Sequence, residues 1–195
     1  MGARSGGGGD TGLERDSNYK GQIKNVEGLK NMKDRQLYNE MKSAISRFYK
    51  EMGIPSRNVN LADLTGVYGI GGEDGVYLNK KHFKNSDKKT LSSKIKNEYA
   101  NGHLTKTNKP VAHILTHELA HTVWNNDMNG TKHIAAGKEI RKVYNAWKKS
   151  KKTGYGKYAG TNVSEFFAEA VTKGIHGKAD KYTKALKKIV KKYKL

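Results

Sequence analysis

Apolar residues recur at helical spacing in the segment that follows Asp34. Steps of three and four residues place them on one face of an α-helix. Asp34 stands where an N-cap is expected, and Gly53 with Pro55 stands where a helix ends. We therefore predict a first amphipathic helix between Asp34 and Gly53, with its buried face formed by Leu37, Met41, Ala44, Ile45, Phe48 and Met52.

Two short apolar pieces follow this helix. Residues 67–70 and 76–78 are separated by the sequence Gly-Gly-Glu-Asp-Gly. β-branched and aromatic residues on both sides of a glycine-rich connection are typical of a β-hairpin. We predict two short strands, joined by a tight turn, in a small antiparallel sheet.

A helix that begins at Pro110 is predicted to have two distinct faces. Proline is favoured at the first position of a helix, where its missing N–H is not needed. One stripe of this helix consists of His113, His117, His121 and Trp124. The opposite stripe is apolar and is expected to pack in the core, and it consists of Ala112, Leu115, Leu119 and Val123.

Three further helices are indicated in the C-terminal part, around residues 140–147, 163–171 and 182–193. The chain therefore predicts an α+β fold, with a small antiparallel sheet packed on the histidine helix and a mainly helical C-terminal part. Residues 1–30 are glycine-rich without periodicity and predict a flexible leader, of the kind that joins a module to something larger. Residues 31–195 are predicted to form one domain.

Composition restricts the chemistry. The chain has no cysteine, so a transition metal can be held only by imidazole and carboxylate groups. Its formal net charge of +20 predicts attraction to polyanions. No apolar run approaches the length of a membrane span, and the first residues have no apolar core that would serve as a secretory signal.

The stretch His117-Glu118-Leu119-Ala120-His121 matches the HExxH pattern. Two histidines four residues apart on one helix face can reach the same zinc ion, and the glutamate beside the first then stands where a general base is needed. His113 makes the same spacing with His117, but Ile114 occupies the position of the base. We expect His113 to pack beside the site or to contact a ligand.

A third ligand must come from elsewhere in the chain. A metzincin would use Asp127, six residues after His121, but Trp124 replaces the glycine that turns the chain back to the metal. A later helix offers Glu165 and Glu169, one turn apart. Glu165 is also placed to form a capping box with Asn162. We favour Glu165 as the ligand, because two carboxylates on one helix face repel each other unless a cation lies nearby.

The HELAH motif, followed by YAGTNVSEFFAEA at residues 158–170, resembles zincin metallopeptidases of the type of the anthrax lethal factor protease domain and the clostridial Pro-Pro endopeptidases. The resemblance covers about residues 111–175. It implies a zincin-like fold and a zinc-dependent endopeptidase that binds one Zn²⁺ per chain. It makes Glu165 the third zinc ligand, beside His117 and His121, and Glu169 a carboxylate that contacts a ligand.

The resemblance also implies two groups that act on the substrate. Tyr158, seven residues before Glu165, matches the tyrosine expected to stabilise the oxyanion, and Tyr155 is its nearest rival. An edge strand above the active-site helix is expected to pair with the backbone of the peptide substrate. Our candidate for this strand is Val76, Tyr77, Leu78 and Asn79.

The C-terminal stretch KADKYTKALKKIVKKYKL alternates apolar and lysine positions. We expect a terminal helix docked by Tyr182, Leu186, Ile189 and Tyr193, with solvated lysines that attract nucleic acid or other polyanions weakly and without sequence preference. The alternative function is a basic nucleic-acid-associated protein of a phage particle with a vestigial or structural zinc site. Without a secretory signal, the protein is expected in the cytoplasm, or as a module delivered with a phage particle or a secreted toxin.

Overall fold

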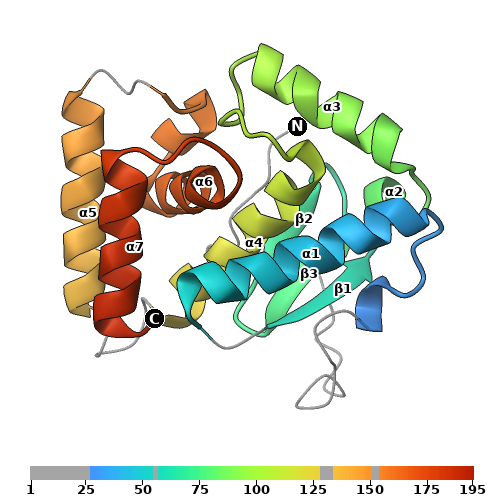
Figure 1. The fold of residues 1–195 in the computed structure, drawn as a ribbon, viewed down its shortest axis with the longest axis horizontal. Helices are drawn as coiled ribbons and strands as arrows, with labels where there is room; N and C mark the ends of the chain where they lie inside the picture. The colour runs from blue at the N-terminus through green and yellow to red at the C-terminus, as the bar shows by residue number, and fades with distance from the viewer. Residues whose placement is uncertain (1–26, 55–56, 128–133, 151–153) are drawn as a thin grey trace.

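The computed structural model describes residues 27–54, 57–127, 134–150 and 154–195. Over these residues the fold is α+β, with seven α-helices and one three-stranded sheet, as expected (Figure 1). Of the predicted flexible leader, residues 1–26 lie outside the description. Residues Glu27–Leu29 form a 3-10 helix, and the side chain of Leu29 is completely buried. No helix in the described ranges is long and apolar enough to cross a membrane.

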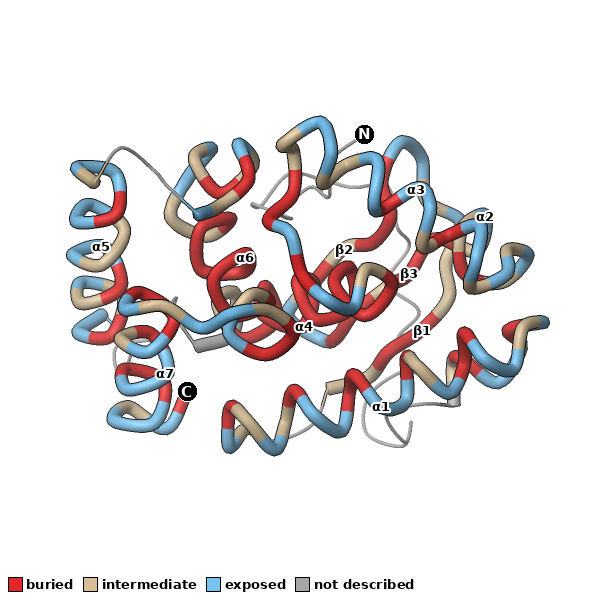
Figure 2. Tube along the Cα trace, turned by 45° about the horizontal axis from the view of Figure 1, so that its top comes forward, coloured by how far each residue is buried: buried red, intermediate tan, exposed pale blue. Residues whose placement is uncertain are grey.

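Helix α1, Arg35–Met52, is the predicted first amphipathic helix. The Asp34 carboxylate accepts hydrogen bonds from the backbone amides of Gln36 and Leu37, at 2.7 and 3.0 Å. Gly53 ends the helix with φ 70°, a left-handed conformation that glycine adopts without strain. Pro55 lies outside the described residues. The predicted apolar stripe is buried, and the opposite stripe is exposed along the length of α1 (Figure 2).

The sheet is mixed, which corrects the prediction of an antiparallel sheet. Strands β1 (Asn58–Ala62), β2 (Gly69–Gly71) and β3 (Gly75–Asn79) lie in the order β1-β3-β2. The predicted hairpin is present, because β2 and β3 are antiparallel neighbours. However, β1, which was not predicted, pairs with β3 in parallel. The crossover from β1 to β3 makes β3 the central strand.

Two helices between the sheet and the histidine helix were not predicted. Helix α2 is the single turn Lys80–Phe83, and helix α3 runs from Lys88 to Ala100. Asp87 is the N-cap of α3, and the second oxygen of Asp34 accepts a hydrogen bond of 2.8 Å from the backbone amide of Lys88 beside it. Through this side chain the N-termini of α1 and α3 are tied together.

Helix α4, Pro110–Asp127, lies at the centre of the molecule. Every residue from 111 to 123 is buried, so both predicted faces are covered and the histidine stripe does not face solvent. The sheet and α1 pack on one side of α4 and α6 packs on the other (Figures 1 and 2). A helix buried all round needs polar partners for every polar side chain that it carries.

The remaining helices form the C-terminal part, as predicted. They are α5 (Ile134–Lys149), α6 (Val163–His176) and α7 (Lys181–Tyr193), with a 3-10 helix at Lys157–Gly160 before α6. Helices α5 and α7 lie side by side at one end of the molecule and pack against α6 (Figure 1). The predicted docking residues of α7 are buried or half-buried: Tyr182, Leu186, Ile189 and Tyr193.

Candidate metal centre

The structure brings His117 and His121 of α4 together with Glu165 of α6. The Nε2 atoms of the two histidines are 3.1 Å apart. Oε2 of Glu165 lies 3.1 Å from Nε2 of His117 and 3.2 Å from Nε2 of His121. The three side chains are fully buried, with at most 1% exposure. The predicted ligand set is therefore one compact group.

The size of this triangle suits a zinc ion. Tetrahedral ligands about 2.0 to 2.1 Å from zinc lie roughly 3.3 Å from one another. The observed separations of 3.1 to 3.2 Å are close to that value. Two imidazole nitrogens and one carboxylate oxygen are also a donor set that zinc accepts, and three protein ligands leave a fourth position for water or substrate. The residues present therefore fit the implied metal.

Local structure explains how Glu165 reaches the histidines. Asn162 is the N-cap of α6, and its side chain accepts a hydrogen bond of 2.9 Å from the backbone amide of Glu165. The cap thus uses the backbone of Glu165 and leaves its carboxylate free to turn toward α4. Next to it, the Ser164 hydroxyl lies 3.0 Å from Nδ1 of His121 and orients that ring. The contact with Ser164 was not foreseen.

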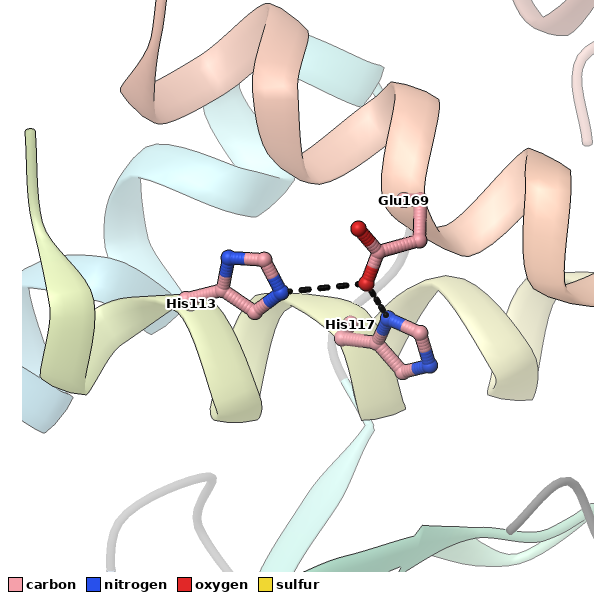
Figure 3. A group of neighbouring side chains, drawn as sticks. All are labelled: His113, His117 and Glu169. Atoms are coloured by element: carbon pink, nitrogen blue, oxygen red, sulfur yellow. Dashed lines mark hydrogen bonds and ion pairs between the residues drawn. The ribbon is translucent and has the colours of Figure 1, made fainter. Parts of the chain in front are cut away.

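Glu169, one turn further along α6, lies behind the first histidine. One oxygen, Oε1, is 3.1 Å from Nδ1 of His117 and 3.1 Å from Nε2 of His113 (Figure 3). The other oxygen accepts a hydrogen bond of 2.6 Å from the backbone amide of Thr105. Glu165 and Glu169 therefore contact the two ring nitrogens of His117 and otherwise have different partners. The predicted contact of Glu169 with a ligand histidine is present.

His113 continues this set of contacts away from the ligands. Its Nδ1 atom lies 3.1 Å from the hydroxyl of Tyr99, in α3. That hydroxyl is in turn 2.9 Å from the hydroxyl of Thr107. Sequence spacing placed His113 on the ligand face, but nothing local pointed to Tyr99 or to the loop before α4. The described residues thus hold a second compact group, His113, His117 and Glu169, which shares one histidine with the first.

The charges of the cluster depend on one another. Burial by itself disfavours charge on His117, but the carboxylates of Glu165 and Glu169 outweigh it and raise the pKa of His117 to about 10. Burial likewise opposes the charge of the two glutamates, and the neighbouring histidines hold both pKa values well below the usual range. Burial lowers the pKa of His121. The carboxylates of Glu165 and Glu169 are therefore anionic, and their negative charge favours a cation at this site.

Glu118 is buried beside these residues, and neither of its carboxylate oxygens has a hydrogen-bond partner among the described residues. Burial raises the pKa of Glu118 to about 8. Strand β2 lies against it: a Cβ atom added to Gly69 would come within 3.0 Å of the Glu118 side chain, and one added to Gly71 within 2.1 Å of the Glu118 carbonyl oxygen. The absence of a side chain at Gly69 and at Gly71 lets β2 approach α4 this closely.

The two candidate tyrosines occupy different places. The ring of Tyr158 stacks on the ring of His117, with centroids 5.8 Å apart, and also contacts His103. Burial and the nearby carboxylates of Glu165 and Glu118 raise the pKa of Tyr158. Tyr155 points elsewhere, because its hydroxyl donates to Asp180 at 3.2 Å. Of the two, Tyr158 lies at the candidate centre.

The predicted substrate strand needs correction. Residues 76–79 belong to β3, which is hydrogen-bonded to β1 on one side and to β2 on the other and has no open edge. The edge beside α4 belongs to β2. The backbone amide of Asn79 donates to the carbonyl of Tyr68, and that of Gly72 donates to the carbonyl of Gly75. In an antiparallel pair every second residue of a strand makes such bonds, so the backbone groups of Gly69 and Gly71 point away from β3.

Asp127, the alternative ligand, ends α4, and its side chain lies outside the description. Comparison of the chain with protein-family models, with curated proteins and with solved structures found no significant match. The resemblance to zincins therefore stays a prediction, and any statement of function has to be argued from the geometry of the site.

Proposed function

We propose that the protein is a zinc-dependent endopeptidase with His117, His121 and Glu165 as its metal ligands. The observation that supports this most is the buried triangle of ligand atoms, with sides of 3.1 to 3.2 Å, next to a buried carboxylate that has no hydrogen-bond partner in the described residues. A purely structural cluster gives no reason to bury the Glu118 carboxyl group unpaired, since a buried polar group without a hydrogen-bond partner is destabilising.

Each group has a role that follows from its position. A bound zinc ion would supply Lewis acidity, which polarises a peptide carbonyl and makes a water molecule more acidic. Glu118 takes the proton of the attacking water and returns it to the leaving amine; a carboxyl with a raised pKa suits both steps. Tyr158 donates a hydrogen bond to the carbonyl oxygen as negative charge develops on it.

The open edge of β2 is the proposed site for the substrate backbone. An extended peptide can add to such an edge as a further strand, and the outward backbone groups of Gly69 and the N–H of Gly71 would supply the hydrogen bonds. The carbonyl of Gly71 is already held by the side chain of Asn125, at 2.9 Å. The remaining groups lie beside Glu118, so a peptide docked there passes the proposed base.

The test measures metal and activity separately. Metal content of the purified protein is determined first, and cleavage of a peptide library is followed by mass spectrometry. We expect one zinc per chain, lost in Glu165→Ala and retained in Asp127→Ala. Glu118→Gln should keep the metal while hydrolysis falls on the order of a hundredfold or more. Full activity in metal-loaded Glu118→Gln, or loss of zinc in Asp127→Ala but not in Glu165→Ala, overturns the assignment.

A second candidate function, binding to nucleic acid, is favoured by the charge of α5 and α7. Helix α5 carries five basic residues and one acidic residue, and α7 carries six lysines and no acidic residue. All eleven basic side chains are exposed, and the two helices lie side by side, so this end of the molecule carries a concentrated positive charge. Its ion pairs include Lys187 with Glu51 and Lys192 with Glu139. A lysine-rich surface of this kind suits phosphate backbones rather than base edges.

Binding of a duplex DNA oligonucleotide, measured at low and at physiological salt, tests this candidate. Replacing Lys184, Lys188 and Lys191 of α7 with glutamine should weaken binding and flatten its salt dependence. The matched control replaces the three exposed lysines Lys89, Lys94 and Lys96 of α3. Equal losses in both variants reject a specific role for the α5–α7 end of the molecule. Sequence-selective binding that survives high salt makes nucleic-acid recognition, rather than hydrolysis, the main function.

A further inference from the structure

The carboxylate of Glu169 bridges two histidine side chains of α4. It is completely buried, and its Oε1 atom lies between a ring nitrogen of His117 and a ring nitrogen of His113, each 3.1 Å away (Figure 3). Its other oxygen is used by the backbone amide of Thr105. A carboxylate has no proton to donate, so both ring nitrogens must carry one to be favourable neighbours.

This requirement sets the state of His117. A histidine that binds a metal through Nε2 carries its proton on Nδ1, and the partner of that proton fixes the plane of the ring. In this chain Nε2 of His117 faces His121 and Glu165, and Nδ1 faces Glu169. The contact is an ion-pair distance without an aligned hydrogen bond, and with a proton on Nδ1 the carboxylate of Glu169 is the group within reach that can hold His117 in the tautomer that a ligand needs.

The same reasoning extends to His113. With its proton on Nε2 toward Glu169, the Nδ1 atom of a neutral His113 is an acceptor, and the hydroxyl of Tyr99 is 3.1 Å from it. The Tyr99 oxygen can then accept from the hydroxyl of Thr107, at 2.9 Å. Every member finds a partner when the donors run from Thr107 through Tyr99 and His113 to Glu169.

We infer that Tyr99 and His113 are positioning residues for the zinc site, which act through Glu169 on the orientation of His117. The inference rests on the proposed zinc site but not on peptide hydrolysis. The chain of contacts links α3, α4 and α6 and is buried apart from the half-buried Tyr99. No water is needed to complete it, so the loss of one donor leaves a buried acceptor unpaired.

The test measures the zinc affinity of the full chain, by competition with a chelator, and the visible absorption spectrum of the Co²⁺-substituted protein. His113→Leu removes the donor to Glu169, and we expect zinc to bind 10- to 100-fold more weakly with an altered Co²⁺ spectrum. His113→Gln keeps an amide donor of similar reach and should restore most of the affinity. Tyr99→Phe should weaken zinc binding several-fold.

The matched control is Thr116→Val, which removes another buried hydrogen bond of α4, the one between Thr116 and His176. It should lower the melting temperature without changing zinc affinity or the Co²⁺ spectrum. Unchanged affinity in both His113→Leu and Tyr99→Phe overturns the inference while the zinc site stands; if His113→Leu does not fold, Tyr99→Phe alone decides. Two zinc ions per wild-type chain, one of them lost in His113→Leu, would replace the inference with a second metal site. A wild-type chain that binds no zinc overturns the proposed function as well.

Discussion

The ring of Tyr158 stacks on the ring of His117, with 29° between the ring planes and 5.8 Å between the centroids. Removal of the hydroxyl in Tyr158→Phe keeps this stacking. We therefore expect zinc content and melting temperature to persist while kcat falls roughly 10²-fold, since the oxyanion loses a donor. Steady-state kinetics on a cleaved library peptide, with metal analysis of the same sample, checks this.

Tyr155→Phe is the matched variant, because the Tyr155 hydroxyl donates to Asp180 and its ring packs against both Trp147 and Phe166. It should lose about 1 kcal/mol of stability and retain its kcat. The reverse pattern, with kcat lost in Tyr155→Phe and kept in Tyr158→Phe, transfers the oxyanion role to Tyr155.

Gly71 is predicted to be intolerant of any side chain. A Cβ atom there would lie 2.1 Å from the carbonyl oxygen of Glu118 and 2.7 Å from the Cβ of His121. Gly71→Ala should therefore push β2 away from α4, with a loss of roughly 1–3 kcal/mol. Chemical denaturation measures the loss. Gly72→Ala is the control, because its Cβ would meet the Asp74 side chain at 3.2 Å, which can move, and the Gly75 carbonyl oxygen at 3.7 Å, an ordinary contact. Equal stability of the two variants contradicts the close packing of β2 on α4.

His176 predicts a pH dependence of stability. It is buried, its Nε2 pairs with the hydroxyl of Thr116 at 2.8 Å, and burial lowers its pKa from 6.5 to about 4. Between these values the unfolded chain binds a proton that the folded chain does not. Stability should therefore fall as the pH drops from about 6.5 to about 4, and this group adds no further loss below that window.

Urea unfolding of the wild type and of His176→Gln across this pH range isolates the effect. The variant keeps a hydrogen-bonding side chain but does not titrate, so its stability should decline less steeply between pH 6.5 and 4. Parallel curves for the two proteins would assign the acid sensitivity to other groups.

Zinc should stabilise the folded chain, because its proposed ligands come from two helices. Glu165 lies 48 residues after His117 and 44 residues after His121. Free zinc at 100 times its dissociation constant adds about 2.7 kcal/mol. A chelator should accordingly lower the melting temperature, and Glu165→Ala should abolish the difference. A melting temperature that is the same with zinc and with chelator in the wild type speaks against the site.

Sequence patterns predicted those helices and strands whose apolar pattern and end signals lie within the element itself. Helix α1 has a full apolar stripe between Asp34 and Gly53, and α4 begins at Pro110 as expected. Helix α3 was missed because only Leu91 and Ile95 are buried among its 13 residues, which is too few for a stripe. Strand β1 was missed because its burial depends on a parallel neighbour that lies later in the chain.

The candidate site likewise contains some contacts that follow from local sequence and others that depend on how distant segments pack. His117 and His121 are one helical turn apart, so their proximity is a local property of α4. Their contact with Glu165 was expected from the repulsion between Glu165 and Glu169 on one helix face and from a resemblance, since nothing local ties α6 to α4. The contacts of Glu169 with His113 and with Thr105 span 56 and 64 residues and depend on how three segments pack. The edge position of β2 follows from strand order, which short apolar pieces do not reveal.

The carboxylate of Asp34 caps α1 and also accepts a hydrogen bond from Lys88, the first residue of α3, 54 residues later. The amide of Lys88 lacks this partner until α1 is in place, so the start of α3 should order together with that of α1. Hydrogen exchange would then show the first amides of α1 and α3 opening together rather than fraying independently. A single surface aspartate in this way makes distant parts of the chain unfold as one unit.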